Sequence, residues 1–123
     1  MRKTILIVED HRMINGYYRL LLDDYPDIEV LFTDTGKNAL SLINTQARPV
    51  DLVLLSYSLL DMDGVVIAKH LRHQGVKAPI CMISTNRLSA QMQSHLHPLI
   101  QRFYQHPLRS DQWQAIVAHY LYP

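Results

Sequence analysis

The stretch Ile5-Leu6-Ile7-Val8-Glu9-Asp10 decides the fold class of this chain. Four apolar residues, three of them β-branched, are followed at once by two carboxylates. A short continuous apolar run of this kind predicts a strand that is buried on both faces, as in a parallel sheet. We therefore expect layers of helices on both sides of a sheet, with Glu9 and Asp10 at the carboxyl end of its first strand.

Apolar runs and amphipathic stretches alternate along the rest of the chain. We expect further strands at residues 28–32, 51–55, 80–83 and 99–104. We expect helices at residues 13–25, 37–45, 64–74, 88–96 and 110–120, with Gly75 after the third helix and Ser110 as the cap of the last. Five strand–helix units in regular order predict a doubly wound α/β fold with a parallel sheet.

The composition of the 123-residue chain limits its class. Hydrophobic residues make up 48% of the chain, enough to bury a core, and the net charge is +1. That balance excludes the basic footprint of a nucleic-acid-binding domain, and no apolar run approaches the roughly 18 residues of a membrane span. The single cysteine, Cys81, excludes an internal disulfide and is typical of a reducing cytosol. We expect one cytoplasmic domain over residues 1–123 that binds neither nucleic acid nor membrane.

Polar side chains follow four of the predicted strands. They are Glu9-Asp10 after the first, Ser56 after the third, Ser84-Thr85 after the fourth and Gln105-His106-Pro107 after the fifth. In an open parallel sheet, the functional site lies outside the carboxyl ends of the strands. The sequence therefore predicts that these side chains share one site.

On these residues, and on the segment Asp51–Gly64 with its Met62-Asp63-Gly64 ending, the chain resembles the response-regulator receiver domain of bacterial two-component signal transduction. The resemblance spans essentially the whole chain. It implies a flavodoxin-like sheet with strand order 2-1-3-4-5 and five helices. It also implies a phosphorelay chemistry, in which an aspartate takes a phosphoryl group with the help of Mg²⁺, an acidic pair, a Ser or Thr and a lysine.

Several positions depart from the family pattern. Aligned on Met62-Asp63-Gly64, the phosphoacceptor position holds Ser56 and the following proline position holds Leu60. Aligned on Pro107, the lysine position holds His106 and the aromatic switch position holds Phe103, while Ser84 matches the Ser or Thr position.

The departures weaken the nucleophile, the metal site and the cationic group together. Ser56 is neutral at pH 7 and needs a general base to attack phosphorus. Its presence also removes one of three anionic Mg²⁺ ligands, so Glu9, Asp10 and the Ser58 carbonyl form at most a weak site. The imidazole of His106 is shorter than lysine and mostly uncharged at neutral pH; we expect it to hydrogen-bond to Glu9 or Asp10, or to face water.

We therefore expect a degenerate receiver: a protein–protein interaction or dimerisation module that requires no cofactor, is not an enzyme and is not phosphorylated on aspartate. The alternative keeps phosphotransfer, with Ser56 or a nearby aspartate such as Asp61 or Asp63 as acceptor and Mg²⁺ as cofactor. A third class, an unrelated flavodoxin-like ligand binder, lacks a glycine-rich phosphate cradle after the strands, and we expect no flavin.

The resemblance also implies partners. These are signalling proteins, namely a histidine kinase, a phosphotransfer domain or an output domain, or a second copy of the chain. The implied surface is formed by residues 88–96, 99–104 and 110–120, where Arg87, Arg102, Arg109 and Asp111 supply polar contacts. The paired histidines His70 and His73, and His95 and His97, have no cysteine or carboxylate at zinc spacing, and we expect them to face solvent.

Overall fold

A computed structural model describes residues 2–46 and 48–122 and contains a parallel sheet of five strands in the order β2-β1-β3-β4-β5. The strands are β1 (Lys3–Val8), β2 (Ile28–Thr33), β3 (Leu52–Ser56), β4 (Ile80–Ser84) and β5 (Arg102–Gln105). All four strand pairs are parallel. The predicted doubly wound α/β fold and its strand order are therefore confirmed.

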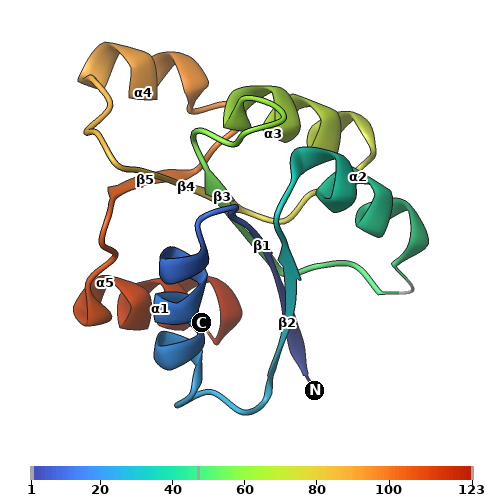
Figure 1. Cartoon of the computed structure of the whole chain (residues 1–123), viewed down its shortest axis with the longest axis vertical. Coiled ribbons are helices and arrows are strands. Elements are labelled where there is room, and N and C mark those ends of the chain that lie inside the picture. The colour runs from blue at the N-terminus through green and yellow to red at the C-terminus, as the bar shows by residue number, and fades with distance from the viewer. Residues whose placement is uncertain (1, 47, 123) are drawn as a thin grey trace.

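Helices cover both faces of the sheet (Figure 1). One face carries α1 (Arg12–Leu22) and α5 (Ser110–Ile116), which continues as a π-helical turn, η1 (Val117–Leu121). The other face carries α2 (Gly36–Thr45), α3 (Gly64–His73) and α4 (Ala90–Leu96). Within residues 2–46 and 48–122, no helix has both the length and the apolarity needed to cross a bilayer.

Alternate side chains of β1 enter two separate hydrophobic clusters. Ile5 and Ile7 pack with α1 and α5, whereas Leu6 and Val8 pack with α2 and α3, and all four are fully buried. Full burial of one such side chain contributes about 1.5–3 kcal/mol. This two-sided burial explains why the strand is a continuous apolar run and not an alternating one.

Two predicted boundaries were wrong. Helix α1 ends at Leu22 and not at Tyr25, because residue 25 precedes Pro26, which disfavours a helical conformation there, and the Tyr25 N–H closes a turn on the Leu22 carbonyl instead. Strand β5 begins at Arg102 and not at residue 99. The N–H groups of Leu99 and Ile100 both donate to the Leu96 carbonyl, so this apolar pair forms a turn, in which Ile100 is buried and Leu99 partly buried.

The predicted cap of the last helix was also wrong. Ser110 is the first residue of α5, and Arg109 is the N-cap. The Arg109 N–H donates to Oε1 of Gln112 at 2.9 Å, which is the side-chain half of a capping box. Helix α4 begins at Ala90, after Leu88, because Ser89 Oγ accepts from the Met92 N–H. Gly75 has φ +92° directly after the C-cap of α3, as predicted.

Candidate functional site

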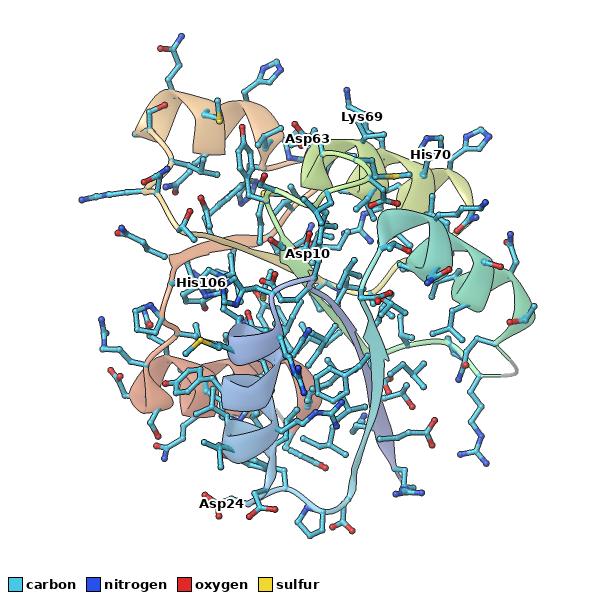
Figure 2. The ribbon with its side chains drawn as sticks, in the orientation of Figure 1. Asp10, Asp24, Asp63, Lys69, His70 and His106 are labelled. Carbon is cyan, nitrogen blue, oxygen red and sulfur yellow. The ribbon has the colours of Figure 1, made fainter. Side chains whose placement is uncertain are left out.

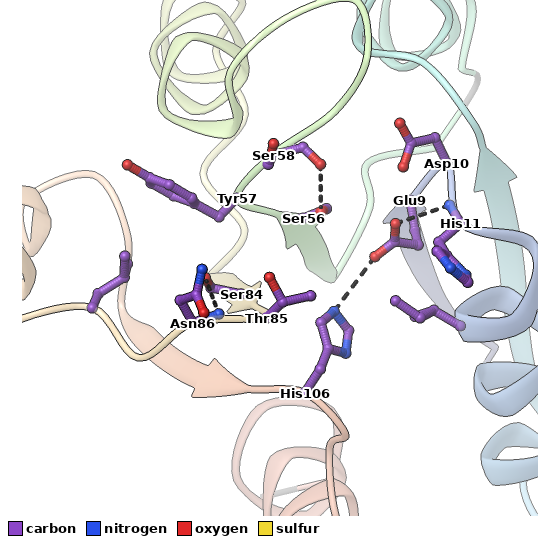
Figure 3. Close-up of a pocket in the computed structure, with 12 residues that line it drawn as sticks. Glu9, Asp10, His11, Ser56, Tyr57, Ser58, Ser84, Thr85, Asn86 and His106 are labelled. Carbon is purple, nitrogen blue, oxygen red and sulfur yellow. Dashed lines mark hydrogen bonds and ion pairs between the residues drawn. The ribbon is translucent and has the colours of Figure 1, made fainter.

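A pocket of about 410 Å³ lies at the carboxyl ends of β1, β3, β4 and β5 (Figure 3). The parallel strands end at the same edge of the sheet, and that edge brings together residues far apart in sequence. Six of the predicted site residues line the pocket: Glu9, Asp10, Ser56, Ser58, Ser84 and His106. The seventh, Phe103, lies outside it and lines a neighbouring hollow on β5.

Glu9 is buried at the end of β1 and faces His106. Its Oε2 accepts from the His11 N–H at 3.0 Å, and its Oε1 lies 3.5 Å from His106 Nε2. The two side chains are only 4% and 11% exposed. Burial raises the pKa of Glu9, but the contacts with His106 and the His11 N–H outweigh it, so the pKa lies below the ordinary 4.5. Glu9 is therefore an ionised carboxylate whose charge is directed at the residue in the family's lysine position.

Asp10 joins the loop after β1 to the loop after β3. Its Oδ2 accepts from the backbone N–H of Leu60 at 2.9 Å, although the Leu60 side chain is 96% exposed. A proline has no backbone N–H. This hydrogen bond exists only because Leu60 stands where the family pattern has proline, a consequence that sequence reasoning missed.

Ser56 is the last residue of β3, and its hydroxyl makes a hydrogen bond within the loop that follows the strand. Its Oγ donates to the Ser58 carbonyl at 3.1 Å, and its side chain is buried. Ser84, at the end of β4, accepts from the Asn86 N–H at 3.2 Å. Each of these two hydroxyls therefore makes a hydrogen bond within the loop that follows its own strand.

Several of the oxygens that the family uses for Mg²⁺ make internal contacts, although Glu9 Oε1 has no hydrogen-bond partner among the described residues. Glu9 faces His11 and His106, Asp10 Oδ2 accepts from Leu60, and the Ser58 carbonyl accepts from Ser56. Mg²⁺ needs octahedral oxygen ligands and usually keeps several waters beside its carboxylates. Within the described residues, no three His, Cys, Asp or Glu side chains are grouped to hold a metal ion. A Mg²⁺ ion bound by Glu9, Asp10 and the Ser58 carbonyl would have to compete with these contacts.

Asp61 and Asp63 lie outside the pocket, because each accepts hydrogen bonds from a helix N-terminus. Asp61 accepts from the Gly36 and Lys37 N–H groups at 2.9 and 3.0 Å, at the start of α2. Asp63 is the N-cap of α3 and accepts from the Val65 N–H at 2.8 Å. Neither carboxylate replaces the aspartate that Ser56 displaces.

The histidines outside the pocket are exposed. His70 and His73 lie on α3, and His95 and His97 lie on and just after α4. Figure 2 shows His70 and Lys69 pointing outward from α3, while Asp10 and His106 lie near the middle of the molecule. Their exposure agrees with the expectation from their spacing.

We predict that Asp61 makes stability depend on pH in the acid range. The backbone N–H groups of Gly36 and Lys37 lower its pKa from the ordinary 3.8. A lowered folded-state pKa means that the ionised carboxylate stabilises the fold above the unfolded value, and that this contribution is lost as the pH falls through the folded value. Below about pH 4, the thermal midpoint of Asp61→Asn should therefore fall less steeply than that of the wild type.

The matched control is Asp24→Asn, at an exposed carboxylate in the loop after α1 (Figure 2). This variant should follow the wild-type decline. Parallel declines for the wild type and Asp61→Asn would contradict the assignment of the acid sensitivity to Asp61.

Comparison with known proteins agrees with this geometry. The chain is 33% identical over 88 residues to a probable transcriptional regulatory protein of Picosynechococcus sp., covering 68% of this chain and 35% of that protein. It is 27% identical over 115 residues to the two-component response regulator ORR41 of Oryza sativa subsp. japonica, covering 93% and 91% of the two chains. The solved structure of the chemotaxis protein CheY4 of Vibrio cholerae matches with a TM-score of 0.85 at 19% identity, covering 98% of this chain and 100% of that one.

The chain thus spans about a third of the length of the Picosynechococcus relative and nearly the full length of the rice relative. The likeness to CheY4 shows the shared fold. A family model, the response regulator receiver domain, matches residues 5–118, a span that contains every residue lining the pocket. The chain therefore belongs to the response regulator receiver domain family, whose members act in signal transduction.

Proposed function

We propose that this chain is a degenerate receiver that acts as a protein–protein interaction or dimerisation module in two-component signalling, without phosphorylation on aspartate and without catalysis of its own. One observation carries the proposal. At the end of β3, where the family places its acceptor carboxylate, the Ser56 hydroxyl donates to the Ser58 carbonyl at 3.1 Å.

Phosphoryl transfer to a receiver depends on a positioned nucleophile and on positive charge around the transferring oxygens. Ser56 is a weak nucleophile whose proton is directed at a carbonyl and not at a base. The long cationic side chain of the family's lysine is replaced by the shorter His106, whose Nε2 faces the ionised Glu9 at 3.5 Å. Both requirements are therefore unmet in the same pocket.

Leu60 adds a third obstacle. Its N–H holds Asp10 Oδ2 at 2.9 Å, and a metal ion at Asp10 would have to compete with that hydrogen bond. The changes at residues 56, 60 and 106 thus support one another, because each replaces an element of the phosphorylation site with an internal contact. This agreement favours a receiver in which the residues at the phosphorylation site contact one another and do not bind a phosphoryl group.

The alternative is phosphorylation of Ser56 or of a nearby aspartate with Mg²⁺. Two observations speak against it. Asp61 and Asp63 are engaged at the N-termini of α2 and α3, and the Ser56 hydroxyl lacks a base. A serine phosphoester would also lack the lability that makes an acyl phosphate a reversible signal.

Restoring the family residues tests the proposal. The double variant Ser56→Asp/His106→Lys, incubated with acetyl phosphate and Mg²⁺, should gain one phosphoryl group by intact-mass spectrometry. Adding Leu60→Pro should increase the extent of labelling, because it removes the N–H donor to Asp10.

The control is Ser56→Ala, which should remain unlabelled like the wild type. A wild-type chain that gains a phosphoryl group, and loses this ability in Ser56→Ala, would establish the alternative. Failure of the folded triple variant to gain a phosphoryl group would contradict the claim that these three positions account for the lost chemistry.

The proposed partners are a histidine kinase, a phosphotransfer domain, an output domain or a second copy of the chain. The surface proposed for them is the α4–β5–α5 face, defined by α4, β5, α5 and η1. The charged side chains on this face indicate which of these classes of partner fits it.

A further inference from the structure

Three adjoining hollows cover the α4–β5–α5 face. Their volumes are about 660, 620 and 550 Å³. The first and second share Gln93 and Phe103, the second and third share Arg102, and the first and third share Tyr104. The hollows therefore adjoin one another along this face. Figure 1 shows α4, the edge strand β5 and α5 along one side of the molecule.

Among residues 2–46 and 48–122, no Asp or Glu lines any of the three hollows. The arginines and histidines that line them are Arg87, Arg102, Arg109, His97, His106 and His119. This bias follows from the sequence. Residues 1–63 contain ten carboxylates against six Lys and Arg, whereas residues 64–123 contain one, Asp111, against six.

Two of the three arginines are available to a partner. Arg109 is engaged, since its guanidinium donates to Asp111 at 2.9 and 3.3 Å. Arg102 is exposed and donates from Nε to the Tyr120 hydroxyl at 3.3 Å, and its two terminal nitrogens have no partner among the described residues. Arg87 is exposed before α4 and has no carboxylate partner among the described residues.

A second copy of the chain does not fit this face. In a symmetric dimer, the same patch meets itself across the two-fold axis. Arg87 and Arg102 would then meet a patch that offers them no unpaired carboxylate, because Asp111, the one carboxylate of residues 64–123, is already paired with Arg109. Like charges placed together oppose association and desolvating them costs further free energy.

Carboxylate groups of another protein fit these two arginines better than the phosphates of a nucleic acid do. Guanidinium groups bind carboxylates in a two-pronged geometry, and Arg and Tyr are enriched at protein interfaces. Tyr104 and Tyr120 lie beside Arg102 in the same hollow. Nucleic acid needs more phosphate contacts than two available arginines can supply, and the chain as a whole has a net charge of +1.

We propose that the α4–β5–α5 face binds a segment of another protein rich in Asp and Glu, with Arg87 and Arg102 as its carboxylate contacts. The proposal rests on the proposed function for the choice of partner class, and it goes further by naming the chemistry of the partner. Phosphoryl uptake is measured by mass and docking by binding, so either proposal can fail without the other.

A labelled oligo-glutamate peptide is the probe, and fluorescence anisotropy with the whole chain is the measurement. We expect binding that weakens as salt is added, since contacts between exposed charges are screened. The double variant Arg87→Gln/Arg102→Gln should bind about tenfold more weakly. The matched control, Lys37→Gln, removes an exposed charge on α2, remote from the face, and should leave the affinity unchanged.

Four outcomes would overturn the proposal. The first is no binding of oligo-glutamate above that of an oligo-glutamine peptide, and the second is equal weakening by the double variant and by Lys37→Gln. The third is tighter binding of a DNA duplex through the same arginines, which would assign the face to nucleic acid. The fourth is self-association in light scattering that the double variant abolishes, which would assign it to a second copy.

Discussion

Gly64→Ala is expected to lower the free energy of unfolding by about 3 kcal/mol. A Cβ at residue 64 would lie 2.2 Å from the Ser56 carbonyl oxygen and 3.0 Å from that of Tyr57. Both obstacles are backbone atoms, which cannot rotate away as a flexible side chain does. The Gly64 N–H also donates to the Tyr57 carbonyl at 2.8 Å, so moving α3 away from the clash breaks this hydrogen bond.

The matched control is Gly16→Ala on α1. Its added Cβ meets nothing within 4 Å, and alanine is favoured over glycine in a helix by roughly 0.5–1 kcal/mol. Denaturant unfolding should show the control to be slightly more stable than the wild type and Gly64→Ala to be much less stable. Equal midpoints for the two variants would contradict the assignment of close backbone packing to Gly64.

Arg72→Met is expected to cost about 3 kcal/mol of stability. From α3, the guanidinium donates to the carbonyls of Val76 and Ala78 at 2.9 and 2.7 Å. It also donates to the Leu99 carbonyl and to Gln101 Oε1, each at 2.9 Å. One side chain thus joins the end of α3 to the chain before β4 and to the turn before β5. Methionine fills similar space but removes the guanidinium donor from the three carbonyls and leaves Gln101 Oε1 with the Ile80 N–H alone.

Arg72→Lys should recover little of this stability, because an ammonium group cannot match the planar fork of a guanidinium. Lys69→Met is the control on the same helix, at an exposed side chain, and should change stability by less than about 0.5 kcal/mol. Thermal or denaturant unfolding measures all three. A stability of Arg72→Met equal to that of Lys69→Met would show that Arg72 is an ordinary surface residue.

The sheet could be predicted from the sequence because a strand that is buried on both faces is a continuous apolar run. Residues such as Ile5 to Val8 must all be apolar when helices cover both faces, and that run is readable in one dimension. Element ends were less predictable. Leu99 and Ile100 are as apolar as the residues of a buried strand, yet their N–H groups donate to the Leu96 carbonyl and form a turn. An apolar pattern indicates that a segment is buried, but it does not show that the segment pairs with a neighbouring strand.

The candidate site was predictable in its members but not in its contacts. Glu9, Ser56 and His106 were expected at one edge because parallel strands end together. The hydrogen bond from Leu60 to Asp10 joins residues 50 positions apart and depends on the conformation of two loops. The fork of Arg72 likewise depends on four acceptors that no sequence spacing brings together. A single sequence does not indicate which hydrogen-bond partners the backbone groups of a loop will have.

The most direct test is the intact mass of the unaltered chain after incubation with acetyl phosphate and Mg²⁺. We predict an unchanged mass, since residue 56 is a serine whose hydroxyl donates to a carbonyl and since His106 faces Glu9. A gain of one phosphoryl group at near stoichiometry, whether labile in acid or stable, would contradict a receiver without phosphorylation.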